Sequence, residues 1–233
     1  MKEAFPGPDL PEVLNPTFDV EAAVASTAED GYFFASQVIT DDCLRAFEQE
    51  VGSLPLEFAD HVAKPLQAGT KKEIRQWHER LYTDIYDTRV PVAAHVARTI
   101  SDGASRLDHL DFALPLWLPN EVGYQRYAEG QGHITAHRDR RNDQILAFTI
   151  TIAGSNLVRI HQTIEDEEDY SETNLELVDE FRTSPGSVMF LRAPGLGNGR
   201  QVIHSVLPPE SGSRLILNLR MRPDILPPPS EFR

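Results

Sequence analysis

A single cysteine, Cys43, is present among the 233 residues. One cysteine cannot form an internal disulfide framework, and it excludes a zinc site built from cysteines. Cys43 lies in Asp-Cys-Leu-Arg-Ala-Phe, which has a helical apolar pattern, so we interpret it as a packing residue. No apolar run approaches the length of a membrane span, and the N-terminal residues lack the apolar segment of a signal peptide. We therefore expect a cytoplasmic protein that does not bind a membrane.

Basic residues are also scarce. The chain has 22 lysines and arginines against 36 aspartates and glutamates, for a net charge of −14. A nucleic-acid partner normally needs a basic face, so we expect no nucleic-acid partner. A cationic small molecule would suit the negative field, although charge alone does not identify a ligand. The expected partner is a small-molecule substrate, and the sequence carries no sign of the oligomeric state.

The length and a hydrophobic content of 40% predict one domain, residues 1–233, with an ordinary buried core. Proline is concentrated at both ends, where it disfavours regular structure. We expect a proline-rich leader, a mixed helical and strand support region, a jelly-roll core with an acidic insertion, and a proline-rich tail. These segments are residues 1–16, 17–110, 111–222 (insertion 163–182) and 223–233.

In the first half of the chain we expect helices to outnumber strands. Residues 31–39 predict a strand. A helix follows over residues 40–51, capped by Thr40 or Asp41, because apolar residues recur there at helical spacing. The same spacing predicts two further helices, at residues 72–82 and 89–101.

The second half has short apolar or alternating runs that are separated by Gly, Pro and Asn. Such runs, with turn signals between them, are typical of an all-β sandwich or barrel. We predict a mainly β protein with α, in which an N-terminal helical layer packs on a double-sheet jelly roll. The predicted strands are residues 122–128, 144–152, 157–162, 187–192, 201–207 and 214–221.

An acidic segment interrupts these strands. Residues 165–181 contain nine aspartates and glutamates. The simpler interpretation is a solvated loop with a short helix near residues 175–181. The functional interpretation is a mobile lid over one end of the barrel.

His137-x-Asp139 ends a polar stretch that begins at Tyr124. An imidazole and a carboxylate two residues apart fall on one face of an extended segment, so both can bind one metal ion. His204, in another strand-like run, is the candidate third ligand. Two histidines and one carboxylate form the facial triad of non-haem Fe(II) oxygenases. A chance pair on a polar loop is the competing interpretation.

The last predicted strand alternates, with Arg214, Ile216, Asn218, Arg220 and Arg222 on one face. A solvated face would give the same pattern. If instead the strands of His204 and Arg214 are antiparallel neighbours, both side chains face one lumen. A buried arginine needs an anion, and a dicarboxylate bound to the metal at its other end would provide one. Tyr127 or Tyr124 could add a hydroxyl, and we favour Tyr127.

His137-Arg-Asp139, Pro185-Gly-Ser and the run from His204 to Arg214 together resemble the Fe(II)/2-oxoglutarate-dependent dioxygenases, over residues 120–222. The second half of this region is especially similar to the prolyl-hydroxylase-like branch, whose pattern is His-x-Val-x-Pro followed a few residues later by Gly-x-Arg. The resemblance implies a double-stranded β-helix fold. It also implies Fe(II) bound by His137, Asp139 and His204, 2-oxoglutarate bound through Arg214 with help from Tyr127, and dioxygen as the other cosubstrate.

Bacterial free-amino-acid hydroxylases and halogenases are similar in size. Halogenases have a small residue in place of the carboxylate ligand, so the intact Asp139 implies hydroxylation. The implied reaction is hydroxylation of an unactivated C–H bond of a small molecule, an amino acid or a natural-product intermediate. Ile216 stands where many members have Ser or Thr, which leaves a second cosubstrate contact unassigned. Hydroxylation of a peptide or protein side chain is the alternative.

Three functions of different classes are less favoured. Arg214 and Arg220 have the spacing of AlkB-like nucleic-acid demethylases, but the chain is acidic. A cupin-like isomerase usually needs His-x-His, which is missing, and a pure binding module would leave Arg214 unexplained.

Substrate contacts are expected on the lumen side of the predicted strands. Each candidate also has a structural interpretation, such as an ion pair or a surface position. The four candidates are His133, Arg159, Asn218 and Arg220.

Overall fold

A computed structural model describes residues 10–54, 59–63, 73–82, 87–104, 117–167 and 169–223. The described residues form three α-helices, α1 (Val20–Asp30), α2 (Asp41–Ser53) and α3 (Pro91–Ala104), and a short 3-10 turn, η1 (Glu172–Asn174). None of these helices is both long and apolar enough to cross a membrane. The strands are β1 (Tyr32–Ala35), β2 (Ala59–Ala63), β3 (Ile74–Tyr82), β4 (Glu121–Tyr127), β5 (His133–His137), β6 (Gln144–Ala153), β7 (Leu157–Thr163), β8 (Leu175–Arg182), β9 (Val188–Arg192), β10 (Ile203–Val206) and β11 (Arg214–Met221).

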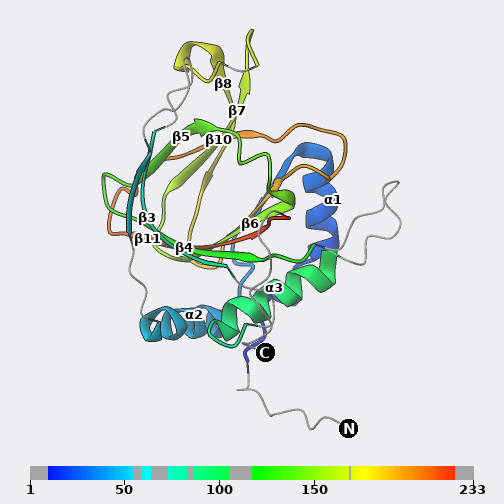
Figure 1. Cartoon of the computed structure of the whole chain (residues 1–233), viewed down its shortest axis with the longest axis vertical. Coiled ribbons are helices and arrows are strands. Elements are labelled where there is room, and N and C mark those ends of the chain that lie inside the picture. The colour runs from blue at the N-terminus through cyan, green and yellow to red at the C-terminus, as the bar shows by residue number, and fades with distance from the viewer. Residues whose placement is uncertain are drawn as a thin grey trace.

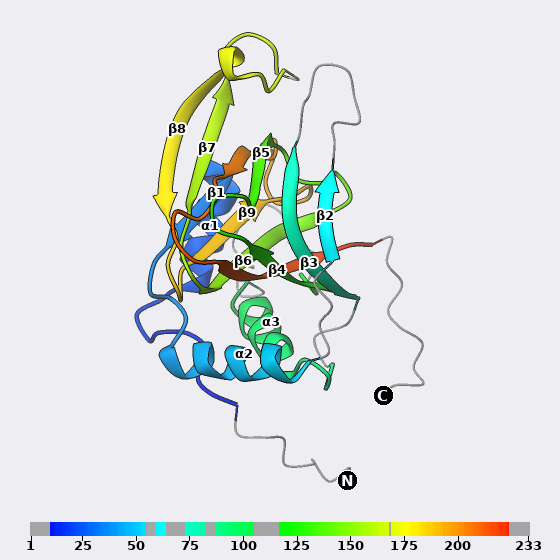
Figure 2. The same ribbon diagram turned by 90° about the vertical axis from the view of Figure 1, so that its left-hand side faces the viewer.

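These strands form one antiparallel sheet in the order β1-β9-β6-β11-β4-β3-β5-β10-β7-β8, with β2 beside β3. The sheet curls around, so that β5, β10 and β7 face β6 and β11 across a lumen (Figures 1 and 2). Side chains join its two end strands. The Tyr32 hydroxyl donates to Asp179 (3.2 Å), and Phe34 stacks on Phe181 with the ring centroids 4.7 Å apart. This arrangement confirms the predicted jelly roll.

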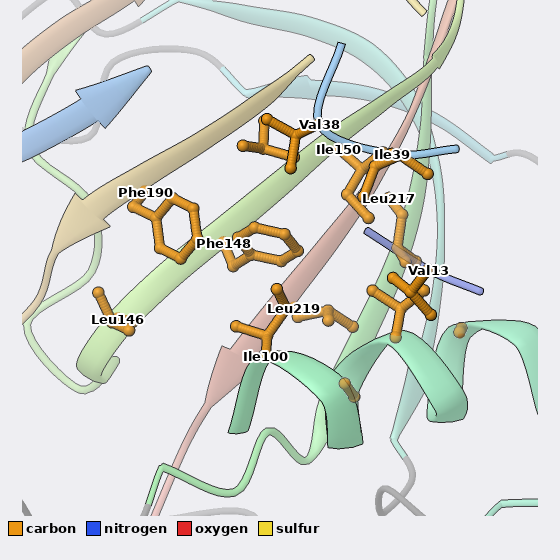
Figure 3. Close-up of a cluster of buried hydrophobic side chains, with 14 of the residues drawn as sticks. Val13, Val38, Ile39, Ile100, Leu146, Phe148, Ile150, Phe190, Leu217 and Leu219 are labelled. Carbon is orange, nitrogen blue, oxygen red and sulfur yellow. The ribbon is translucent and has the colours of Figure 1, made fainter. Parts of the chain in front are cut away.

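The helices cover the outer face of β6, β9 and β11. Figure 3 shows the buried cluster between them, in which Ile100 of α3 lies beside Leu219 of β11 and shares the cluster with strand residues Phe148, Phe190 and Leu217. Burying each such side chain contributes about 1.5–3 kcal/mol. The predicted N-terminal helical layer is thereby confirmed, and the odd-numbered leucines of β11 point into it.

Glu50, a buried residue of α2, stabilises the start of α3. Its carboxylate accepts hydrogen bonds from the backbone N–H groups of Val92 (2.6 Å) and Ala93 (3.3 Å). Burial nevertheless raises the pKa of Glu50. The Tyr124 hydroxyl also donates to this carboxylate. Tyr124 therefore points into the helical layer, away from the lumen.

Two helix predictions were wrong. Residues 72–82 contain β3, because hydrogen bonding to strands on both sides outweighs the helix-favouring composition of that segment. Residues 175–181 lie in β8, where Leu175 and Leu177 alternate with polar residues along the edge of β7. The predicted strand at 31–39 is limited to β1, whereas the helices predicted at 40–51 and 89–101 correspond to α2 and α3.

Candidate metal centre

Three side chains meet at one end of the lumen. His137 is the last residue of β5, Asp139 follows it by two residues, and His204 lies in β10 directly opposite His137 in the strand register. One ligand atom from each lies within 4.8 Å of the other two. The histidine rings are 4.3 Å apart, and His137 Nε2 is 3.8 Å from Asp139 Oδ1. Two imidazole nitrogens and one carboxylate oxygen are a donor set that suits Fe(II).

The backbone fixes the orientation of the His137 ring. Its Nδ1 lies 2.8 Å from the carbonyl oxygen of Thr135. A carbonyl only accepts, so this contact assigns the proton to Nδ1 and makes Nε2 the basic nitrogen. A hydrogen bond of this kind on the second ring nitrogen is usual in metal-binding histidines. The ring is therefore preset for a ligand role.

Asp139 lies beside the guanidinium of Arg220. Arg220 Nη1 donates to Asp139 Oδ2 (2.9 Å) and Nη2 to Oδ1 (3.3 Å). Burial raises the pKa of the Asp139 carboxyl, but Arg220, His204 and His137 outweigh burial and hold that pKa well below its usual range. Asp139 is therefore ionised at neutral pH, as a metal ligand must be.

The triad opens into a cavity of about 240 Å³. The face of β11 with Arg214, Ile216, Asn218 and Arg220 lines this cavity, and the first three are buried. The interpretation of that face as solvated is therefore wrong. The neighbouring arrangement of the His204 and Arg214 strands that we considered is not found: β10 lies between β5 and β7, whereas β11 lies between β6 and β4. His204 and Arg214 reach the same lumen from facing sides, not from neighbouring strands.

Arg214 is deeply buried, with 2% of its surface exposed. Its guanidinium donates to Thr151 Oγ1 (2.9 Å) and lies over the Tyr127 ring (5.7 Å). Among the described residues it has no ion pair with a carboxylate. Burial lowers the pKa of Arg214 to about 10, so it stays cationic at neutral pH. A buried cation without a carboxylate partner in a cavity is suited to an anionic ligand.

Tyr127 is opposite Arg214 in the strand register and faces the cavity. Its hydroxyl lies 3.0 Å from Gln76 Oε1 and 3.1 Å from Gln125 Oε1. The sequence interpretation missed both glutamines. Gln76 was missed because its segment was assigned to a helix, whereas the strand period places Gln125 and Tyr127 on one face and could have identified Gln125.

The four candidate substrate contacts fall into two groups. Asn218 and Arg220 line the cavity. His133 and Arg159 line a separate groove of about 960 Å³ on the outer side of β5, β10 and β7. Arg159 is paired there with Glu180 (2.6 Å). The structure therefore does not bring His133 and Arg159 together with the triad.

The first part of the acidic segment, in the connection from β7 to β8, contacts the candidate metal motif. Arg138, between the two ligands of His137-x-Asp139, donates to the backbone oxygens of Gln201 (3.0 Å) and Glu167 (3.0 Å) and to the Tyr170 hydroxyl. Its guanidinium also lies 5.4 Å from the centre of the Tyr170 ring. One side chain thus connects the candidate metal motif with the β7–β8 connection, which stands at the top of Figure 2.

Comparisons with known proteins identify the fold. No protein-family model matches the sequence, and no curated protein matches it. The solved structures that are similar include a prolyl-4-hydroxylase from Pseudomonas putida, with 16% identity, a TM-score of 0.53, and coverage of 87% of this chain and 98% of that one. Another is a prolyl hydroxylase from Trichoplax adhaerens, solved with a hypoxia inducible factor peptide fragment (11% identity, TM-score 0.58, coverage 88% and 89%).

An oxidoreductase of the 2OG-Fe(II) oxygenase family from Burkholderia pseudomallei is also similar (13% identity, TM-score 0.55, coverage 92% and 95%). The alignments extend over nearly the whole of each chain. This protein therefore has the fold of the prolyl hydroxylases and of this 2OG-Fe(II) oxygenase.

Proposed function

We propose that the protein is a non-haem Fe(II)/2-oxoglutarate-dependent dioxygenase that hydroxylates an unactivated C–H bond of a small molecule. The observation that carries the proposal is the position of Arg214. It is a buried cation with no carboxylate partner among the described residues, and it shares a cavity with two histidines and an aspartate. A metal ligand set at one end and an arginine at the other match a dicarboxylate with two separate ends.

Each residue then has a distinct task. His137, Asp139 and His204 hold Fe(II), which together with 2-oxoglutarate and dioxygen supplies the oxidising chemistry. Arg214 binds the distal carboxylate of 2-oxoglutarate, and the Thr151 hydroxyl orients its guanidinium. Tyr127, beside that guanidinium, adds a hydroxyl contact. The surrounding apolar side chains, such as Ile216 and Val158, keep water from the cavity.

The size of the cavity favours a small substrate. About 240 Å³ must hold 2-oxoglutarate and the reacting part of the substrate. Asn218 and Arg220 are the candidate substrate contacts that line it. The intact Asp139 favours hydroxylation over halogenation.

A peptide substrate is the second candidate. One similar structure is a prolyl hydroxylase in complex with a peptide fragment. A comparison of free amino acids with short peptides, scored by substrate-dependent succinate formation, separates the two candidates. If succinate forms with peptides and not with free amino acids, the substrate is a peptide and the small-molecule proposal is wrong.

Anaerobic titration of the apoprotein with Fe(II) and then 2-oxoglutarate tests the proposed function. We expect a visible metal-to-ligand charge-transfer band in the wild type and none in His137→Ala. Arg214→Ala loses charge-assisted hydrogen bonds of about 1.5–3 kcal/mol and should need about 10- to 100-fold more 2-oxoglutarate. A wild type without any band that depends on 2-oxoglutarate would refute the proposal.

A further inference from the structure

The two oxygens of Asp139 have different surroundings. Oδ1 is the oxygen that lies 3.8 Å from His137 Nε2. Its hydrogen bond from Arg220 is the longer one, at 3.3 Å. Oδ2 receives the shorter bond, at 2.9 Å from Arg220 Nη1. Both oxygens thus accept from Arg220, but Oδ1 holds the longer bond and lies on the side of His137, whereas Oδ2 holds the shorter bond.

A second carboxylate holds Arg220 in this position. Asp143, whose side chain is fully buried, accepts from the same Nη1 atom at 2.7 Å. Asp143 ends the connection from β5 to β6 that also contains Asp139. Arg140 lies 3.4 Å from the other oxygen of Asp143. Arg220 therefore keeps an anionic partner even if a metal ion draws charge from Asp139.

The way in which Asp139 binds matters for the chemistry. A carboxylate that binds through both oxygens takes two positions around a metal ion, whereas one oxygen takes one. If two histidines and only one oxygen of Asp139 held Fe(II), more positions around the ion would remain for 2-oxoglutarate and dioxygen than if both oxygens bound it.

We propose that Arg220 is a positioning residue that restricts Asp139 to binding the metal through Oδ1 alone, and that Asp143 fixes the Arg220 guanidinium for this purpose. The inference rests on the proposed function and adds a role to residues on β11 and on the β5–β6 connection. Arg220 then belongs to the metal site, and the substrate contacts must come from other lining residues.

Two anaerobic titrations test this inference: Fe(II) alone in competition with a coloured chelator, and 2-oxoglutarate at saturating Fe(II). Removing a cation beside the ion does not weaken electrostatic attraction, so Arg220→Gln should bind Fe(II) at least as tightly as the wild type. It should need about tenfold or more 2-oxoglutarate for half of the charge-transfer band, because Asp139 is free to use both oxygens. Lysine at this position can still donate to Oδ2. Arg220→Lys should therefore need nearly as little 2-oxoglutarate for half of the band as the wild type does.

Two further variants complete the experiment. Asp143→Asn keeps the shape of the side chain. It should also leave Fe(II) binding unweakened and raise the 2-oxoglutarate concentration needed for half of the band, but only about threefold. Arg222→Gln is the matched control, since Arg222 lies on the same strand side but pairs with Glu121 (3.2 Å). It should behave as the wild type in both titrations.

The outcomes are distinct. An unchanged 2-oxoglutarate titration in Arg220→Gln overturns the inference, and so does a parallel loss of Fe(II) and 2-oxoglutarate binding in both Arg220→Gln and Asp143→Asn. A wild type that shows no 2-oxoglutarate-dependent band instead overturns the proposed function.

Discussion

Arg214 holds a positive charge where water hardly reaches it. Its guanidinium contacts the Thr151 hydroxyl and the Tyr127 ring, which compensate a charge less well than a carboxylate does. The burial of this charge lowers the free energy of unfolding of the protein. The binding of an anion is the function that would offset this cost.

Replacing Arg214 by methionine should therefore separate stability from ligand binding. Arg214→Met has a similar volume and no buried charge, so we expect the free energy of unfolding without ligands to rise by about 1–3 kcal/mol. Binding of 2-oxoglutarate should be lost in the same variant. Urea unfolding and the 2-oxoglutarate titration measure the two effects.

Arg214→Lys is the control, because it keeps the charge and should gain no stability. An Arg214→Met variant that is less stable than the wild type and still binds 2-oxoglutarate normally would contradict a ligand role for this residue.

The sequence identified the residues that come together at the candidate site. It did not identify the neighbouring residues that fix their positions. The His137-x-Asp139 spacing and the alternation of the last strand follow from local geometry, which a sequence reports directly. The pairing of Arg220 with Asp143 depends on the path of the β5–β6 connection. An irregular connection leaves no periodic pattern, so this pairing could not be predicted.

Among the elements, the β7–β8 connection has a direct link to the candidate metal motif through one side chain, Arg138. Arg138 donates to it at Glu167 and Tyr170. Arg200 also forms an ion pair with Glu167, but both of those side chains are exposed. Arg138 makes several contacts, and its hydrogen bonds to Tyr170 and Gln201 are partly buried, so it should hold the connection more firmly than the single exposed ion pair does.

Arg138→Ala should loosen this connection. We expect faster hydrogen–deuterium exchange at the backbone amides of residues 164–174, while the amides of β6 and β11 stay protected. Arg200→Ala is the matched control and should change exchange little. Equal effects of the two substitutions would show that Arg138 does not anchor the segment.

The elements that were assigned wrongly share a physical cause. Residues 72–82 and 175–181 contain several good helix formers, and each segment becomes a strand because a neighbouring strand offers hydrogen bonds along its length. Intrinsic propensity differs by a few tenths of a kcal/mol per residue, which tertiary pairing easily exceeds. By contrast, α2 and α3 have apolar stripes that match the face of the sheet they cover, so local and tertiary preferences agree.

At the scale of the whole molecule, the sheet is one continuous structure whose two ends meet without a hydrogen-bonded ladder. The contact between β1 and β8 consists of aromatic rings and the Tyr32–Asp179 hydrogen bond. β8 has β7 as its only strand partner among the described residues, so these rings are its main tie to the other end of the sheet.

Phe181→Ala should weaken this closure. The side chain stacks on Phe34 and also contacts Tyr32, with ring centroids 5.7 Å apart. We expect a loss of about 1–3 kcal/mol in the free energy of unfolding, measured by urea denaturation.

Val178→Ala, at an exposed position of the same strand, is the control and should change the free energy of unfolding by less than about 0.5 kcal/mol. A Phe181→Ala variant as stable as the control would mean that the aromatic contacts do not close the sheet.

The side chains of strand β11 alternate between the hydrophobic core and the cavity. Leu217 and Leu219 point to the helices and pack in the main hydrophobic cluster, whereas Ile216 and Asn218 line the cavity. Exchanges at Ile216 and Asn218 would therefore change the lining of the cavity while the contacts of Leu217 and Leu219 with the helices stay intact. Such a strand gives a lineage of proteins, or a directed-evolution library, a route to new specificities in which most variants still fold.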